Sequence, residues 1–309
     1  MSLQPFYKNE EMRGVALKVL VTGAGGLIGS TVFKKLTNSG IETYGLLRQD
    51  ENKNKNYICG NLLEKELFTS LHAYKFDYII HCAASIPGIV DDCTSANINR
   101  IMDDNIIDYA YMSGANIIYC SSASVYGFSV NERVDENSKI NCSSKYAKNK
   151  YLTEQKLLNQ NFKSTILRIT SPYGKNQKNN NVLMIFIKNA LCDNDIKYYG
   201  SGSRTQDFIH VDDICEVVLK CLYGNCEGIF NIASGVPISM FDLATLIISL
   251  VSTTKSKVLP AGIPDVQEDF RAFFDISKAR KELSWNAMIP HRKGFLEMID
   301  NIRENYLKS

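Results

Sequence analysis

The sequence predicts an α/β protein in which helices cover both faces of a doubly wound parallel sheet, with a smaller and mostly helical C-terminal lobe. Short apolar runs, of the length of buried parallel strands, alternate with helical patterns through the first half of the chain. A glycine-rich turn joins the first apolar run to the first helical pattern. After Tyr173 the pattern becomes less regular and more helical. A strand–helix alternation of this kind argues for a parallel sheet.

The expected elements follow that order along the chain. Buried strands are expected at Leu17–Val21, Thr43–Leu47, Tyr78–His81, Ile117–Cys120 and Thr165–Ile169, with a further strand ending at "ICGNLLEKE". The helices among them are expected at Leu27–Thr37, Glu64–Leu71, Ile98–Met112 and Tyr146–Asn159. Later helices are expected at Val182–Leu191, Val211–Leu222, Ser239–Ser252, Ser277–Leu283 and His291–Tyr306.

Composition excludes several classes of function. The 309 residues are 45% hydrophobic and 22% charged, as in ordinary soluble proteins, and a net charge of +2 gives no argument for nucleic acid or an anionic membrane as the main partner. Met1–Gly14 is polar and is expected to be a loose arm, and no apolar stretch has the length of a membrane span or a secretory signal. The nine cysteines are scattered without a Cys-x-x-Cys pair, and the four histidines form no metal-binding helical pair. We therefore expect free thiols, no metal and a cytoplasmic location.

The glycine-rich turn "KVLVTGAGGLIGS" is the strongest local signal. Gly23, Gly26 and Gly29 have the spacing G-x-x-G-x-x-G, directly after an apolar strand and at the start of a helix that opens with Leu27 and Ile28. Glycine allows the tight turn and the close approach of a pyrophosphate, and the helix N-terminus supplies amide donors. The turn predicts a dinucleotide site on a Rossmann-like fold. A P-loop is excluded because no Gly-Lys-Ser/Thr follows.

The end of the second strand bears on the choice between NAD and NADP. An acidic residue usually binds the 2′-hydroxyl of NAD there, but this chain has Leu47 followed by Arg48. A guanidinium matches a 2′-phosphate, so we favour NADP as the cofactor. The alternative is NAD, with Arg48 on the surface and Asp50 or Glu51 reaching the ribose.

Two further strand ends are expected to line the cofactor. In "ICGNLLEKE", Asn61 is placed to hydrogen-bond an adenine edge, with Leu62 beside it. In "HCAAS", the small Ala83 and Ala84 would let the backbone pass close to the cofactor, and Ser85 is a candidate for substrate binding. Small residues at strand ends also serve packing. We expect a dinucleotide-binding domain over 15–173, to which 203–233 returns, and a substrate-binding lobe over 174–202 and 234–309.

The segment "SSKYAKNK" contains the one Tyr-x-x-x-Lys of the chain. Tyr146 and Lys150 would lie one above the other on a helical face. A phenol is almost fully protonated at neutral pH, and a nearby ammonium favours the phenolate. The pair is therefore a candidate proton donor and acceptor, although such a short motif also arises by chance.

The segment "YCSSASVYG" follows the fifth strand, where hydroxyl groups face the crevice that binds ligands in such sheets. With the glycine turn before it and Tyr-x-x-x-Lys after it, the chain resembles the short-chain dehydrogenase/reductase superfamily. It most resembles the extended branch that acts on nucleotide sugars, the NAD(P)-dependent epimerase/dehydratase family. "ILRITSPYG", "GSGSRTQDFIHVDDI" and "FFDISKARKELSW" extend this resemblance to near the C-terminus.

The resemblance implies a catalytic triad of Ser122, Tyr146 and Lys150, with Ser124 as the nearest rival of Ser122. Tyr146 would exchange a proton with a sugar hydroxyl while hydride moves between the nicotinamide and the same carbon. Lys150 would bind the ribose and favour the phenolate, and Ser122 would hydrogen-bond the reacting oxygen.

Departures from the family pattern narrow the reaction. Dehydratases of the family carry acid/base side chains directly after the catalytic hydroxyl, where this chain has Ala123 and Ser124. Water elimination needs such groups, so a dehydratase is not expected.

Ser171, Arg204 and Arg271 are expected to bind the substrate. Ser171 stands where many relatives have Asn, and the position where an Arg is frequent holds Gln206 in this chain. Arg204, two residues earlier, and Arg271 are candidates for clamping a diphosphate. The alternative for both arginines is a solvated surface charge.

The sequence leaves three functions open. The favoured one is an NADP(H)-dependent reductase of a 4-keto nucleotide sugar. The alternative is an NAD-dependent UDP-sugar 4-epimerase. A non-catalytic dinucleotide-binding scaffold is disfavoured because Tyr146 and Lys150 are both present. The resemblance also implies a homodimer, formed through the helix of Tyr146 and the neighbouring helix over 98–112.

Overall fold

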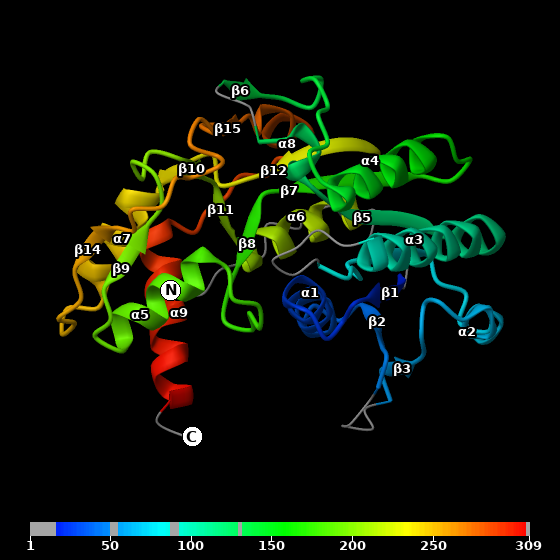
Figure 1. The fold of residues 1–309 in the computed structure, drawn as a ribbon. Helices are drawn as coiled ribbons and strands as arrows, with labels where there is room; N and C mark the ends of the chain where they lie inside the picture. The colour runs from blue at the N-terminus through cyan, green and yellow to red at the C-terminus, as the bar shows by residue number, and fades with distance from the viewer. Residues whose placement is uncertain (1–16, 50–54, 87–92, 129–131, 307–309) are drawn as a thin grey trace.

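The fold is built on a seven-stranded parallel sheet, seen in a computed structural model that describes residues 17–49, 55–86, 93–128 and 132–306 (Figure 1). The strand order is β12-β7-β5-β4-β1-β2-β3. The strands are β1 (Lys18–Thr22), β2 (Glu42–Leu47), β3 (Tyr57–Cys59), β4 (Tyr78–His81), β5 (Asn116–Ser122), β7 (Ser164–Ile169) and β12 (Gly228–Ile232). The predicted arm at Met1–Gly14 and the alternative ribose ligands Asp50 and Glu51 lie outside the described residues.

Helices cover both faces of this sheet because its strands alternate their side chains between two cores. Val19 and Val21 of β1 face one core, and Leu20 between them faces the other. The first core is shared with α1 (Leu27–Asn38), α6 (Val211–Gly224) and α8 (Ser277–Glu282). The second is shared with α2 (Lys65–Leu71), α3 (Cys93–Ser113) and α4 (Lys145–Leu158). The predicted doubly wound parallel sheet is confirmed.

A smaller, mostly helical lobe lies beside the sheet, on the left of Figure 1. Its core is formed by α5 (Val182–Leu191), α7 (Met240–Leu250) and α9 (His291–Tyr306). Two short strand pairs complete it, β9 (Ile196–Tyr198) with β14 (Val258–Pro260) and β10 (Thr205–Gln206) with β13 (Ile238–Ser239). Among the described residues, no helix combines the length and the apolar character that crossing a membrane requires.

Two further strand pairs lie near the carboxyl edge of the large sheet. They are β8 (Ser171–Tyr173) with β11 (Phe208–His210) and β6 (Arg133–Val134) with β15 (Phe273–Phe274). Segments far apart in the sequence therefore meet beside the ends of β5 and β7. The chain returns to the large sheet at β12, which pairs with β7. The exact division of the chain into two domains stays a prediction.

Candidate active site

The glycine turn after β1 has the close packing that a dinucleotide site requires. Gly23 has a φ of +66°, and a Cβ there would lie 2.8 Å from the Cα atom of Ala83. A Cβ at Gly29 would collide with the carbonyl oxygen of Gly23. Gly26 is the N-cap of α1, and among the described residues no side chain caps this helix end. The first-turn amides are thus available to an anion, and the turn fits a pyrophosphate.

The residues predicted to contact the cofactor at the ends of β2 and β3 differ in whether they are available to it. Arg48 follows β2 and is exposed. Both amide atoms of Asn61 are used locally, because Nδ2 donates to Glu64 and Oδ1 accepts from the backbone of Leu63, each at 3.2 Å. Leu62 is buried, and its carbonyl oxygen accepts a hydrogen bond from Asn105 at 2.8 Å. Asn61 would therefore have to exchange its present partners for an adenine edge.

The hydroxyl group of Ser122, at the end of β5, is already oriented. It accepts one hydrogen bond from the backbone N–H of Ser124 at 3.2 Å and another from the Ser124 hydroxyl at 2.9 Å. A serine hydroxyl has two acceptor lone pairs and one proton. In this arrangement both lone pairs of Ser122 are used, and its own proton is left to donate to a further group. Ser124, the predicted rival, instead orients Ser122, and its backbone contact caps the short helix η2 (Ala123–Tyr126).

Tyr146 and Lys150 lie on α4, which begins after Ser144 and packs against η2 and β5. The Ser144 hydroxyl accepts from the N–H of Ala147 at 3.0 Å and so caps the helix just before the pair. The Nζ atom of Lys150 lies 5.9 Å from the centre of the Tyr146 ring and donates to the carbonyl oxygen of Cys120 at 2.9 Å. The predicted helical pair is thus brought together over the end of β5.

The Lys150 side chain is only 3% exposed, yet the structure favours its charged form. Burial lowers the pKa of Lys150, but the negative charges of a Tyr146 phenolate and of Asp103 outweigh burial and leave the pKa above its ordinary value. Lys150 is therefore an ammonium at neutral pH, and it lies beside the ring of Tyr146.

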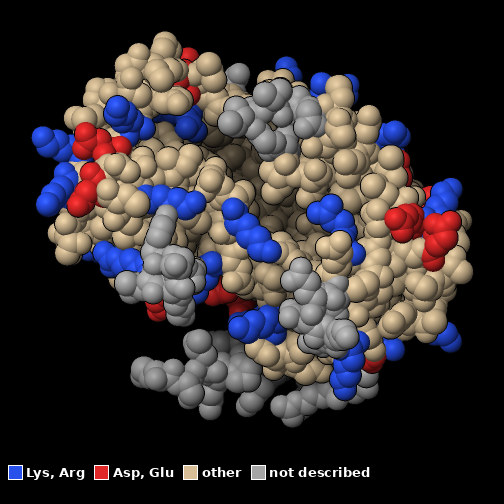
Figure 2. All heavy atoms as spheres, turned by 60° about the horizontal axis from the view of Figure 1, so that its bottom comes forward, with Lys and Arg blue, Asp and Glu red and all other residues tan. Residues whose placement is uncertain are grey.

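A cavity of about 130 Å³ opens beside Ser122. Four predicted residues line it: Ser122, Ser124, Ser171 and Arg204. Sequence reasoning missed several others, among them Thr170, Asp207, Gln267 and the aromatic residues Phe128, Phe270 and Phe274. Figure 2 shows a hollow between the two lobes with Lys and Arg side chains beside it, which suits an anionic ligand.

The predicted substrate residues differ in where the structure places them. Arg204 is 19% exposed and is paired with Asp265, with 2.7 Å between Nε and Oδ2, so it is not a free surface charge. Neither Ser85 nor Arg271 is among the described residues that line the cavity. The backbone of Ser85 binds Asn99, and Arg271 donates to Ser203.

Asp207 is the only carboxylate among the described residues that line the cavity. Its oxygens accept hydrogen bonds from the backbone N–H groups of Ser234 and Gly235 at 2.7 and 2.9 Å. Burial raises the pKa of Asp207 above its ordinary value. The carboxylate thus holds the loop after β12 in place. Because these backbone N–H groups occupy its oxygens, we assign Asp207 no proton transfer to a sugar.

Known proteins resemble the chain over most of its length. The sequence profile of the NAD dependent epimerase/dehydratase family matches residues 19–233. A putative UDP-glucose 4-epimerase of Methanocaldococcus jannaschii is 28% identical over 93% of this chain and 99% of its own length. A dTDP-glucose 4,6-dehydratase of Streptomyces niveus is 24% identical over 94% of each chain.

A solved structure agrees with the fold. The UDP-glucose 4-epimerase of Thermus thermophilus, in complex with NAD, superposes with a TM-score of 0.82 at 23% identity, over 93% of this chain and 99% of that one. The resemblance read from the glycine turn, the serine segment and Tyr-x-x-x-Lys is confirmed by the family match. The chain belongs to the NAD-dependent epimerase/dehydratase family, in the extended branch of the short-chain dehydrogenases/reductases.

Proposed function

We propose that this protein oxidises and reduces carbon 4 of a nucleotide sugar, and that it acts as an NAD-dependent 4-epimerase of a UDP-sugar. The observation that carries the proposal is the Ser122 hydroxyl, which lines a cavity and is oriented by Ser124 so that its own proton can be donated. Tyr146 and Lys150 lie on α4, which packs against β5 and η2, and are not among the described residues that line this cavity. The names of the relatives, UDP-glucose 4-epimerases among them, support epimerisation over net reduction.

Each residue of the triad has its own role in this reaction. Tyr146 accepts the proton of the sugar hydroxyl as the carbon is oxidised, and returns it on reduction. Ser122 donates a hydrogen bond to the same oxygen, and Lys150 holds the ribose of the cofactor and stabilises the phenolate. When bound, the nicotinamide dinucleotide supplies the hydride acceptor and donor. The configuration at carbon 4 is inverted when the keto sugar rotates before reduction, so that the hydride returns to its opposite face.

Elimination of water is not part of the proposal. The residue after Ser122 is the buried Ala123, and the hydroxyl of Ser124 is used by Ser122. Asp207 is held by the backbone. These contacts supply no acid/base pair of the kind that a 4,6-dehydration needs, although dTDP-glucose 4,6-dehydratases are among the relatives.

A second candidate is the NADP(H)-dependent reduction of a 4-keto nucleotide sugar. One observation favours it: the exposed Arg48 directly after β2, where a guanidinium would meet a 2′-phosphate. NADP is therefore kept as the alternative cofactor.

The two candidates differ in what they consume. We would release any bound nucleotide by denaturation and identify it by mass spectrometry, then offer UDP-galactose alone and a 4-keto-6-deoxy sugar nucleotide with NADPH. Conversion to UDP-glucose without net oxidation, lost in Tyr146→Phe, supports the epimerase. Stoichiometric NADPH oxidation, weakened in Arg48→Ala, supports the reductase. If the protein turns over neither substrate, both candidate functions are refuted.

We also propose that the protein pairs through α3 and α4, which pack side by side. Large apolar side chains are exposed on both helices: Ile101, Tyr111 and Met112 on α3, and Leu152 and Leu158 on α4. Burial of such side chains favours association. Sedimentation should show a dimer that Leu152→Lys weakens, and a monomeric wild type would refute it. A cytoplasmic location stays a prediction.

A further inference from the structure

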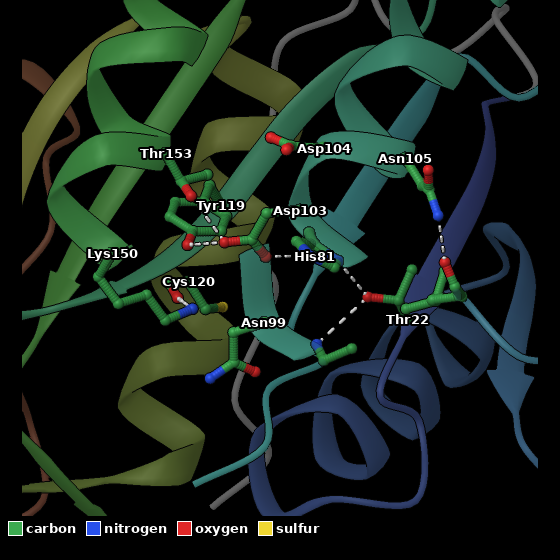
Figure 3. A network of polar contacts seen from close by, with 12 residues as sticks. Thr22, His81, Asn99, Asp103, Asp104, Asn105, Tyr119, Cys120, Lys150 and Thr153 are labelled. Carbon is green, nitrogen blue, oxygen red and sulfur yellow. Dashed lines mark hydrogen bonds and ion pairs between the residues drawn. The ribbon is translucent and has the colours of Figure 1, made fainter. Parts of the chain in front are cut away.

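A buried carboxylate lies under the cofactor end of the sheet and has no role in the proposed reaction. Asp103, on α3, is 2% exposed and receives three hydrogen bonds (Figure 3). The hydroxyl groups of Tyr119 and Thr153 donate at 2.8 and 2.7 Å, and Nε2 of His81 lies 2.9 Å away. A carboxylate with three donors around it is stable as an anion, but a buried anion also needs a nearby cation.

One branch of this network leads to Lys150. The ammonium of Lys150 lies 4.4 Å from the centre of the Tyr119 ring, whose hydroxyl group donates to Asp103. Burial raises the pKa of Asp103, but the hydrogen bond from His81 and the positive charge of Lys150 outweigh burial and lower the pKa below its ordinary value. The two buried charges therefore stabilise each other across the Tyr119 side chain.

The other branch leads to the glycine turn. Nδ1 of His81 lies 2.6 Å from the Thr22 hydroxyl, which accepts from the N–H of Ala83 at 3.2 Å. With Nε2 donating to Asp103, Nδ1 is left to accept the proton of Thr22. Thr22 ends β1 directly before Gly23, which packs against Ala83. The network thus ties the ends of β1 and β4 together under the turn.

We propose that Asp103 is a positioning residue for both halves of the dinucleotide site. Its charge holds Lys150 as an ammonium, and its hydrogen bond to His81 fixes Thr22 and, through it, the glycine turn. Only the statement that Lys150 holds the dinucleotide rests on the proposed function.

The variant Asp103→Asn tests this because it keeps the shape and removes the charge. His81 can accept from the new amide and donate to Thr22 instead, so the fold should persist. Asp104→Asn is the matched control: Asp104 is the next residue, lies outside the dashed network of Figure 3, and pairs at the surface with Lys156.

The readout is the dissociation constant of NAD⁺ and of NADP⁺, measured by calorimetry from about pH 7 to about pH 10. The wild type and Asp104→Asn should bind the dinucleotide with the same affinity as each other, and this affinity should stay constant across the pH range. In Asp103→Asn the pKa of Lys150 falls, so affinity should decline at the alkaline end by up to about tenfold per pH unit. Identical profiles for the two Asn variants would overturn the proposal.

Other titratable groups face Lys150 and need a control. Tyr146 lies on its own helix, Tyr119 and Cys120 on β5, and Cys82 directly after β4. Tyr146 is the group removed as a control, because its ring centre lies 5.9 Å from Nζ of Lys150. The alkaline decline should therefore persist in the double variant Asp103→Asn/Tyr146→Phe, and its disappearance there would assign it to Tyr146 and contradict the role of Lys150.

A second measurement does not depend on cofactor binding. If neither dinucleotide binds the wild type, the proposed function fails, and the link between Asp103 and Lys150 is read from urea unfolding of Asp103→Asn, Lys150→Met and the double variant. Each single variant leaves one buried charge without its counter-charge. The double variant should therefore lose less stability than the sum of the two, whereas additive losses would overturn the proposal.

Discussion

Replacing Arg168 with methionine should destabilise this protein far more than the same replacement at Arg133. Arg168, on β7, is 2% exposed, and its guanidinium donates to both oxygens of Glu154, which is 0% exposed, at distances down to 2.7 Å. The Ser121 hydroxyl donates to the same carboxylate at 2.5 Å. Without Arg168 this buried charge would lose its counter-charge, at a cost of about 3–5 kcal/mol.

Arg133 provides the control because its ion pair with Asp275, at 2.7 Å, lies at the surface. Its side chain is 64% exposed, and such pairs contribute about 1 kcal/mol or less. The two variants should therefore differ by about 3 kcal/mol. With a urea dependence of about 3 kcal/mol per molar, the midpoint of Arg168→Met should lie about 1 M below that of Arg133→Met.

The assay can use Trp285, the single tryptophan of the chain. Its ring is buried in the core between the sheet and α6, and its indole N–H donates to the carbonyl oxygen of Asp213 at 3.0 Å. Its fluorescence therefore reports loss of that core. A double variant, Glu154→Met/Arg168→Met, should recover part of the lost stability because no charge stays buried. Equal midpoints for Arg168→Met and Arg133→Met would refute the reasoning.

Three further predictions concern the site and the effect of pH. Ser122→Ala should lower kcat about a hundredfold and leave dinucleotide affinity, measured by calorimetry, unchanged; an equal loss of affinity would mean a structural role. Gly23→Ala should lower the free energy of unfolding by about 2 kcal/mol or more, because φ is +66° and the new Cβ would meet Ala83, and it should also weaken dinucleotide binding. Gly40→Ala, with φ of +80° and no other described atom within 4 Å of the new Cβ, should cost only about 1 kcal/mol in the same urea titration, and equal losses would count against the contact. Burial lowers the pKa of His210, so the unfolded state takes up the proton first and the free energy of unfolding should fall from about pH 7 to about pH 5; His210→Gln should flatten this slope, and an unchanged slope would contradict it.

Much of the fold could be predicted because the central strands are buried on both faces and so read as continuous apolar runs. The boundaries were less accurate where polar residues are buried. The helix predicted from Ile98 begins at Cys93, and α3 turns Asn99 and Asp103 inward, so its apolar period is weak. The strand predicted to end at Cys120 continues to Ser122, because serine side chains do not carry the apolar signal.

The parts of the site that could be predicted are local in sequence. The glycine turn and the pair Tyr146 and Lys150 each lie within a few residues, so their spacing alone reports their geometry. Gln267 reaches the cavity from a distant segment, and no local pattern marks it. The pairing of Arg204 with Asp265 joins residues 61 apart and could not be read from either neighbourhood.

The return of the chain to β12 has a consequence for how the two lobes can be separated. β12 hydrogen-bonds along β7, yet it is reached only after the chain has built α5 and the first strands of the smaller lobe. A fragment that stopped after β8 would expose the backbone of β7 as an open edge, where another chain can add. The chain then leaves β12 for α7, returns to the core of the sheet at α8 and ends in the smaller lobe at α9. A single protease cut could therefore not release either lobe intact.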